Sequence, residues 1–258
     1  MTTVQPLPAF TDNYLWLVTQ GDEVLVVDPG DAAVVQRHLE AQALRLRAIL
    51  VTHHHPDHTG GIAALRARWD VPVYGPRAEA AKIGELSEAL DGGDTIDVLG
   101  ARYAVLAVPG HTLGHIAFHD AAAQRLFCGD TLFSAGCGRL FEGTPAQMHA
   151  SLQTLAALPD ATAVHCTHEY TLSNLSFAAA VEPDNADLQA RIEEAGRLRA
   201  AGRPTLPSTI GAEKRYNPFL RTRVAAVRAA AERQAGSALD GEVAVFAALR
   251  RWKDGFRG

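Results

Sequence analysis

The chain has 258 residues, of which 47% are hydrophobic and 21% are charged, and its formal net charge at pH 7 is −5. This length suffices to bury a large core, and the charge excludes a strongly basic nucleic-acid-binding protein. The sequence has no run of about 18 apolar residues and lacks the basic start and apolar stretch of a signal peptide. We therefore expect no membrane span and no secretion.

The three cysteines, Cys128, Cys137 and Cys166, are an odd number and lie far apart in the sequence. No Cys-x-x-Cys pair is present, so neither a thiolate metal site nor a redox pair is predicted. The pattern also argues against a disulfide framework and favours a reducing cytoplasm.

Strand and helix patterns alternate in the first part of the chain. A hairpin is predicted at 14–18 and 23–27, and an amphipathic helix over 32–44. Further strands are predicted at 48–51, 71–74, 102–108, 116–119, 125–128 and 161–166, with helices at about 61–69 and 145–158. This alternation predicts an α/β domain over residues 1–168.

Strand patterns fade beyond residue 170. Helical spacing of Ala, Leu, Arg and Glu continues over 185–201, 221–235 and 241–252, and 203–208 is interpreted as a linker or surface loop. We expect a small helical domain over 169–258. Residues 1–165 carry a net charge of −8 and residues 166–258 one of +3, so this part suits a small anionic ligand, a solvated helical surface being the alternative.

A dense run of metal-binding residue types follows the predicted strand at 48–51. His53, His55, Asp57 and His58 fall within six positions. On an extended segment His53 and His55 point the same way, and Pro56 then turns the chain toward a helix. The run therefore suggests two pairs of ligands that face two different ions.

Three further candidates, His111, Asp130 and His168, each follow a strand-like segment. His111 is flanked by glycines that let the backbone approach an ion, and Asp130 is the natural bridging carboxylate. Together the seven residues supply five imidazoles and two carboxylates, the donor set that two close divalent ions prefer. A fortuitous surface cluster of histidines is the alternative.

Other residues of similar type are left out of the predicted site. His54 should point away from the ligand pair, and His115 and His165 are interpreted as packed or supporting residues. Asp28 is interpreted as a turn-forming aspartate, although it could orient a ligand histidine. Cys137 lies between glycines in a predicted tight turn and is not a candidate nucleophile. The remaining histidines, His38, His119 and His149, are assigned to the surface or core.

The run His53-x-His55-x-Asp57-His58, followed by His111, Asp130 and His168, resembles the metallo-β-lactamase superfamily, whose fold is an αββα sandwich. Longer motifs resemble the glyoxalase II (hydroxyacylglutathione hydrolase) family, and the helical tail is itself typical of this family. These motifs are Thr11-Asp12-Asn13-Tyr14, residues 136–144, residues 168–174, Asn217-Pro218-Phe219-Leu220-Arg221 and residues 249–256.

The resemblance implies a binuclear metal site. His53, His55 and His111 would hold one ion, Asp57, His58 and His168 the other, and Asp130 would bridge both. Zinc is the expected metal, and iron and manganese are the alternatives. The two ions would lower the pKa of a bridging water to about 7. The hydroxide would then attack the thioester carbonyl of S-(2-hydroxyacyl)glutathione, with S-D-lactoylglutathione giving D-lactate in the second step of methylglyoxal detoxification. Asp57 and Asp130 are the catalytic carboxylates of this prediction.

The resemblance also implies the residues that bind glutathione. They are Arg139, Phe141, Tyr170, Arg250 and Lys253. Arginine pairs with a carboxylate through two hydrogen bonds, whereas lysine acts as a point charge. Phe141 departs from family members that have tyrosine there, so one hydrogen bond to the ligand would be missing. For Arg250 and Lys253 the alternative is an exposed, charged helix end.

Other functions remain open at this point. A related metallohydrolase could act on a lactone, β-lactam or phosphodiester, and a single-iron dioxygenase could act on glutathione persulfide. In a mononuclear site Asp57 would be a base instead of a ligand. A non-enzymatic metal- or glutathione-binding module is the third alternative. We expect a monomer that acts on a small glutathione thioester, with neither nucleic acid nor membrane as partner.

Overall fold

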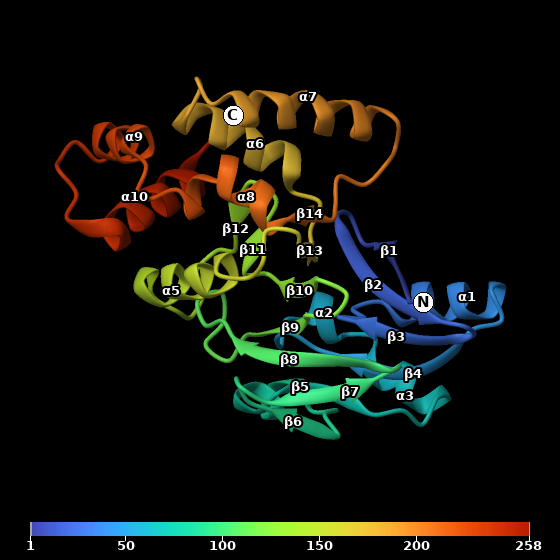
Figure 1. Ribbon diagram of the computed structural model, residues 1–258. Helices are drawn as coiled ribbons and strands as arrows, with labels where there is room; N and C mark the ends of the chain where they lie inside the picture. The colour runs from blue at the N-terminus through green and yellow to red at the C-terminus, as the bar shows by residue number, and fades with distance from the viewer. Residues whose placement is uncertain (1, 258) are drawn as a thin grey trace. The chain divides into compact units, whose positions relative to one another are not determined.

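The computed structural model describes residues 2–257, which form two compact units (Figure 1). Unit 1 comprises Met1–Ala107 and Leu113–Gly129, and unit 2 comprises Val108–Thr112 and Asp130–Gly258. The predicted boundary at residue 168 is a different division of the chain and stays a prediction.

The first sheet of unit 1 has six strands in the order β1-β2-β3-β4-β5-β6. The strands are β1 (Thr3–Ala9), β2 (Asn13–Gln20), β3 (Glu23–Val27), β4 (Arg45–Leu50), β5 (Val73–Pro76) and β6 (Glu88–Leu90). The first three are antiparallel and the last three join in parallel, so the hairpin predicted at 14–27 is confirmed. The parallel strands deliver the chain repeatedly to one edge of the sheet, where β4 ends just before His53.

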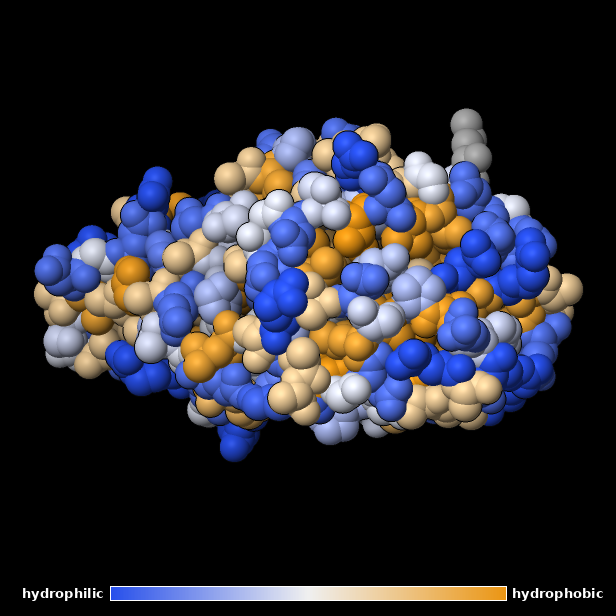
Figure 2. Space-filling model, turned by 90° about the horizontal axis from the view of Figure 1, so that it is seen from below, coloured by the Kyte–Doolittle hydropathy of each residue, from blue (hydrophilic) through white to orange (hydrophobic). Residues whose placement is uncertain are grey.

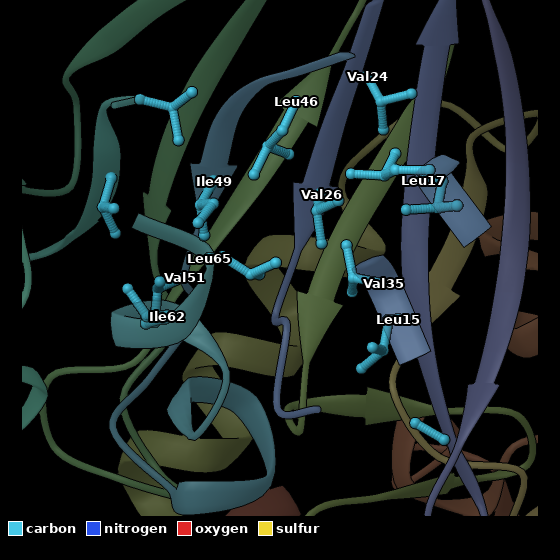
Figure 3. Close-up of a cluster of buried hydrophobic side chains, with 14 of the residues drawn as sticks. Leu15, Leu17, Val24, Val26, Val35, Leu46, Ile49, Val51, Ile62 and Leu65 are labelled. Atoms are coloured by element: carbon cyan, nitrogen blue, oxygen red, sulfur yellow. The ribbon is translucent and has the colours of Figure 1, made fainter. Parts of the chain in front are cut away.

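Helices cover one face of this sheet. They are α1 (Ala32–Ala41), α3 (Ile62–Arg68) and α4 (Ala80–Ile83), which all contribute to the apolar cluster on that face. The short helix α2 (Pro56–Thr59) and the 3-10 helix η1 (Arg77–Glu79) lie between them in the sequence. Figure 3 shows Val35 of α1 and Leu65 of α3 among the aliphatic side chains of β2, β3 and β4. Because the intervening residues Leu25 and Val27 are buried as well, both faces of the sheet are covered.

The other strands of unit 1 are all antiparallel neighbours in the order β10-β9-β8-β7. Their bounds are β7 (Thr95–Val98), β8 (Ala101–Ala107), β9 (Ile116–Asp120) and β10 (Arg125–Gly129). Every residue of β9 is buried. Unit 1 is thus a mixed α/β structure, as the alternating pattern of the sequence predicted.

Unit 2 is mainly helical. Its helices are α5 (Pro145–Ala156), α6 (Thr171–Val181), α7 (Ala186–Ala200), α8 (Ile210–Tyr216), η2 (Pro218–Leu220), α9 (Ala225–Ala235) and α10 (Gly241–Gly255). Two short strand pairs accompany them: the hairpin of β11 (Leu132–Phe133) with β12 (Gly136–Cys137), and β13 (Ala163–Cys166) with β14 (Ser208–Thr209).

Some elements differ from the prediction. β1 contains Pro6 and Pro8, which argue against a strand, yet β1 is an edge strand, where a missing N–H is tolerated. The predicted linker at 203–208 is wrong as a surface segment because Thr205 and Leu206 are buried. Ser208 already belongs to β14. The conformation of this stretch is therefore determined by its packing against the rest of unit 2.

The surface mixes residue types. Figure 2 shows hydrophobic residues gathered over part of one face, with hydrophilic residues around and between them. Within residues 2–257, no helix combines the length and apolar character that crossing a membrane requires.

Candidate metal centre and ligand cavity

The ligand-type residues of unit 1 meet at the end of β4. His55 stands at the N-cap position of α2 without a side-chain capping bond, and Pro56 occupies the first helical position, where its missing N–H costs nothing. His53 Nε2 lies 2.9 Å from His55 Nδ1, and the rings of His53 and His58 are 4.0 Å apart. The four predicted ligands of the run are therefore divided by Pro56 between an extended segment and a helical turn.

Asp28 supports this group from the end of β3. Its Oδ1 accepts a hydrogen bond from the Thr52 backbone N–H at 2.8 Å, and its Oδ2 lies 3.0 Å from Nδ1 of the buried His58. A carboxylate beside Nδ1 favours the tautomer in which Nε2 is the potential metal ligand. Asp28 thus stands in a turn, as expected, and also contacts a candidate ligand histidine, the alternative that the sequence left open.

Asp57 is held by a residue from a distant part of the chain. The Asn13 side-chain amide donates to Asp57 Oδ2 at 2.9 Å, and this oxygen lies 3.5 Å from His58 Nε2. A Cβ at Gly30 would lie 1.9 Å from the Asp57 carbonyl oxygen, so only glycine lets the two backbones approach. Asn13 stands in a motif that marked the family resemblance, which was its only signal in the sequence.

Two neighbouring histidines have supporting positions. His54 lies with Nδ1 2.8 Å from Glu79 Oε2 and so points toward another partner, as its place between His53 and His55 predicted. The same carboxylate group accepts from the Gly114 backbone N–H at 3.0 Å. The His115 ring stacks on that of His53 at 4.6 Å, which fits a packing role.

The ligand-type residues of unit 2 converge on Asp130. His111 Nε2 and His168 Nε2 lie 3.4 and 3.3 Å from Asp130 Oδ2. His111 Nδ1 lies 2.9 Å from the Arg139 carbonyl oxygen, to which it donates, so the tautomer that leaves Nε2 as an acceptor is favoured. A Cβ at Gly138 would lie 1.9 Å from the Asp130 carbonyl oxygen, which explains a glycine there.

The chemistry of both groups fits divalent metal ions. Within each unit the donors are imidazole nitrogens and carboxylate oxygens, and His53, His58, His111, Asp130 and His168 are buried. Imidazoles and carboxylates bind zinc, iron and manganese. Burial of such polar groups is costly unless they are paired or bind a metal. Each unit therefore brings together its own share of the seven predicted ligands.

A cavity of about 450 Å³ lies within unit 2. It includes His111 and Asp130, two of the candidate metal ligands, and all five residues that were predicted to bind glutathione. Its lining is formed by His111, Asp130, Phe133, Cys137, Arg139, Phe141, Tyr170, Ser173, Asn174, Arg250, Lys253, Asp254, Phe256 and Arg257. Ligand-type residues and several cations thus share one cavity wall.

Arg250 is not an exposed charge, because only 5% of the residue is accessible. Its Nη1 donates to the Cys137 carbonyl oxygen at 2.9 Å, and its Nη2 donates to Asp254 Oδ1 at 2.9 Å. Its guanidinium also lies over the Phe219 ring at 5.2 Å. The alternative interpretation of Arg250 as an exposed helix end is therefore wrong.

Lys253 follows Arg250 by three residues on α10. Its Nζ donates to the backbone oxygen and the hydroxyl of Ser173 at 2.9 and 3.1 Å. Burial, together with the positive charges of Arg250 and Arg139, lowers the pKa of Lys253 to about 8. The ammonium group is therefore held in place but is easily deprotonated.

The aromatic residues of the cavity are placed differently from each other. Phe141 is 63% exposed and meets the edge of the His111 ring. Tyr170 stacks parallel on His168 at 4.7 Å. Cys137 is buried, and burial raises the pKa of its thiol to about 11, so a thiolate nucleophile is disfavoured.

Several cavity residues were not predicted from the sequence. Asp254, Arg257, Ser173 and Asn174 all line the cavity. Arg257 had no motif to mark it, whereas Asp254 lies four residues after Arg250 on one face of α10, a spacing at which opposite charges pair.

Comparison with known proteins identifies the family. The family model described as "Metallo-beta-lactamase superfamily" matches residues 10–168, and that described as "Hydroxyacylglutathione hydrolase C-terminus" matches residues 169–256. A protein named "Hydroxyacylglutathione hydrolase" from Dechloromonas aromatica (strain RCB) is 53% identical, over 99% of this chain and all of its own. Its namesake from Albidiferax ferrireducens is 58% identical, over 97% of this chain and 98% of its own.

Solved structures agree with the fold. ETHE1 from Myxococcus xanthus has a TM-score of 0.67 at 24% identity, covering 99% of this chain and 90% of its own. TTHA1623, solved in a di-iron-bound form, has a TM-score of 0.61 at 28% identity, covering 84% of this chain and all of its own. With the predicted αββα sandwich and helical C-terminal region thus confirmed, the chain belongs to the hydroxyacylglutathione hydrolase family, a family of enzymes within the metallo-β-lactamase superfamily.

Proposed function

We propose that the protein hydrolyses S-(2-hydroxyacyl)glutathione to glutathione and a 2-hydroxy acid. The proposed substrate is S-D-lactoylglutathione, which would give D-lactate in the second step of methylglyoxal detoxification in a reducing cytoplasm. The single observation that carries this proposal is the cavity of unit 2. Its wall combines metal-ligand residues, His111 and Asp130, with the cations that an anionic peptide would need.

The proposed metal site uses seven residues. His53, His55 and His111 would hold one ion, Asp57, His58 and His168 the other, and Asp130 would bridge. When bound, two divalent ions would lower the pKa of water to about 7 and so supply a hydroxide nucleophile near neutral pH. Zinc is the proposed metal, and iron and manganese suit the same donors. This assignment rests on the donor chemistry in each unit and on the family.

The protein's own groups would hold the ligands in their reactive form. The Asp28 carboxylate lies 3.0 Å from His58 Nδ1 and the Arg139 carbonyl oxygen accepts from His111 Nδ1, so both imidazoles would present Nε2. Asn13 would restrict Asp57 to one orientation through the bond to Oδ2. Such hydrogen-bonded partners preserve ligand geometry and basicity.

The cations of the cavity would bind the glutathione part of the substrate. Lys253 and Arg139 would attract its carboxylates, and Tyr170 would offer a hydroxyl. Phe141 would contribute an apolar surface without a hydrogen bond. Arg250, bonded to Cys137 and Asp254, would add positive potential and hold the cavity wall.

Steady-state hydrolysis of S-D-lactoylglutathione by metal-loaded protein tests the proposal. The control substrate carries the same acyl group on a short non-peptide thiol. A strong preference for the glutathione thioester is expected because only this substrate has carboxylates for the cavity cations. Equal rates would indicate a generic thioesterase. No hydrolysis of either thioester would refute the proposal, and oxygen consumption with glutathione persulfide would then identify the dioxygenase alternative.

A further inference from the structure

We propose that Asp254 is a specificity-determining residue that binds the ammonium group of the glutathione moiety. The inference rests on the proposed function and adds a third point of recognition, beyond the two carboxylates of the ligand.

The cavity has an excess of positive charge. Arg139, Arg250, Lys253 and Arg257 line it, and Asp254 is the only carboxylate of the lining besides Asp130, which belongs to the metal-ligand group. The buried Arg250 is neutralised by Asp254 at 2.9 Å. Three cations therefore remain for an anionic ligand.

Asp254 has an oxygen available for a further partner. Its Oδ1 receives Arg250 Nη2 at 2.9 Å and lies 3.9 Å from Arg139 Nε. Within residues 2–257, no hydrogen bond or ion pair involves Oδ2 of Asp254. The side chain is 45% exposed and lines the cavity, so this oxygen is accessible to a ligand.

The charge pattern matches glutathione. Its γ-glutamyl residue carries a carboxylate and an ammonium on the same carbon atom, and its glycine carries a second carboxylate. An amino acid head group is best bound where a cation and an anion lie side by side, so that both of its charges are paired. Arg139 and Asp254 provide such a neighbouring pair in the cavity.

Binding of two ligands that differ only in the ammonium group tests the inference. One is S-methylglutathione, and the other is its analogue with glutaryl in place of γ-glutamyl, which keeps both carboxylates. Calorimetry with metal-loaded protein gives Kd for each ligand without turnover. We expect the wild-type protein to bind S-methylglutathione about fivefold more tightly, as a partly exposed ion pair would give, and Asp254→Asn to bind both ligands equally.

The variants separate recognition from support of Arg250. Asparagine keeps an acceptor for Arg250 Nη2 but removes the charge that attracts an ammonium. Asp240→Asn removes a charge from the beginning of the same helix, outside the cavity, and should keep the wild-type ratio of Kd values.

Two outcomes of this comparison would overturn the inference. One is no preference in the wild type; the other is an unchanged ratio in Asp254→Asn, and if both ligands are then weakened equally, Asp254 only supports Arg250. Failure of S-methylglutathione to bind would overturn it too. Failure of the proposed function is recognised separately, by the absence of thioester hydrolysis.

Discussion

Asp28 serves the backbone and the candidate metal ligands at the same time. Its φ of 52° lies in the left-handed region, which aspartate and asparagine tolerate better than most residues. Asp28→Asn should therefore keep the turn but place an amide N–H against the donors of His58 and Thr52. Loss of such a partner weakens metal affinity by about 10- to 100-fold. Competition with a chromophoric chelator measures this affinity.

Asp70→Asn is the matched control for Asp28→Asn. It removes an exposed carboxylate of the same unit, and the metal affinity measured by competition with the chelator should not change. Wild-type metal affinity in Asp28→Asn would show that the contact with His58 does not tune the ligand.

The lowered pKa of Lys253 should make ligand binding depend on pH. Burial, then Arg250 and Arg139, lower its pKa to about 8, so the ammonium is charged below that pH and neutral above it. A bound carboxylate favours the charged form, so Kd for S-methylglutathione should rise as the pH increases above about 8. A total rise of about fivefold is expected for one partly exposed cation.

Lys253→Arg is the control for this pH dependence because arginine keeps its charge throughout the range. Its Kd should show only the change that comes from the ligand's own amine. The same rise in both proteins would mean that Lys253 does not contribute. The effect of the Lys253 pKa on stability has the opposite direction. Between pH 8 and the ordinary lysine pKa of 10.5 the unfolded chain binds more protons, so the folded state gains stability as the pH rises.

At the scale of residues, the candidate metal ligands could be selected from the sequence because their types and spacing are themselves the signal. His53, His55, Asp57 and His58 stand almost side by side in the sequence. Their supporting partners could not be predicted in the same way. Asn13 lies 44 positions from Asp57, and Asp28 lies 24 positions from Thr52. Only folding brings these residues together, and an isolated Asp or Asn has no pattern.

The hairpin of β11 and β12 is held by polar residues from helical segments of unit 2. Buried Asn217 donates to the carbonyl oxygens of Phe133 and Gly136 at 3.1 and 3.0 Å, and Glu213 accepts from the Ala135 N–H at 2.8 Å. The hairpin carries Phe133 and Cys137 into the cavity wall. The conformation of the hairpin therefore depends on the hydrogen bonds from Asn217 and Glu213 as much as on the pairing of its own two short strands.

Asn217→Ala should reduce the free energy of unfolding by about 3 kcal/mol because several buried acceptors lose their donor. Urea denaturation of the metal-loaded protein measures the change. Asn185→Ala is the comparison: Asn185 caps α7 by accepting from the Leu188 N–H, and loss of such a cap costs about 1 kcal/mol. Equal losses in the two variants would contradict the special role of the hairpin.

At the scale of elements, strands and helices with strong periodicity were predicted within a few residues. α7 was expected at 185–201 and spans Ala186–Ala200. Elements that depend on neighbours were missed. β11 and β12 have two residues each, too few for any periodicity. α6, with Thr171, Ser173 and Asn174 in its first turn, has weak helical propensity there and forms largely through packing of its buried face.

At the scale of the whole molecule, charge and chemistry are distributed along the chain in a way that the sequence already indicated. The net charge of +3 in residues 166–258 includes Arg250, Lys253 and Arg257, which line the cavity. Part of the positive charge of this segment therefore lies in the wall of the candidate ligand cavity, and not on a merely solvated helical surface. The individual contacts needed the structure, since Arg250 proved to be buried.

Removal of metal should destabilise the protein as a whole. Ions that bind only the folded chain raise its stability by about 2.7 kcal/mol when their concentration is 100 times Kd. For a chain of this size that corresponds to a Tm about 5 to 10 °C higher. Calorimetry before and after dialysis against a chelator measures the shift, and readdition of zinc should restore it.

Asp130→Ala distinguishes this metal effect from other actions of the chelator. The variant lacks the proposed bridging carboxylate, so it should lose metal and thioester hydrolysis together, and its Tm should already be low. Chelator should then change its Tm little, because hardly any bound metal remains to be removed. An Asp130→Ala protein that keeps its metal and full activity would refute the bridging role, whereas a wild-type Tm that is indifferent to chelator would mean that the ions add nothing to folding.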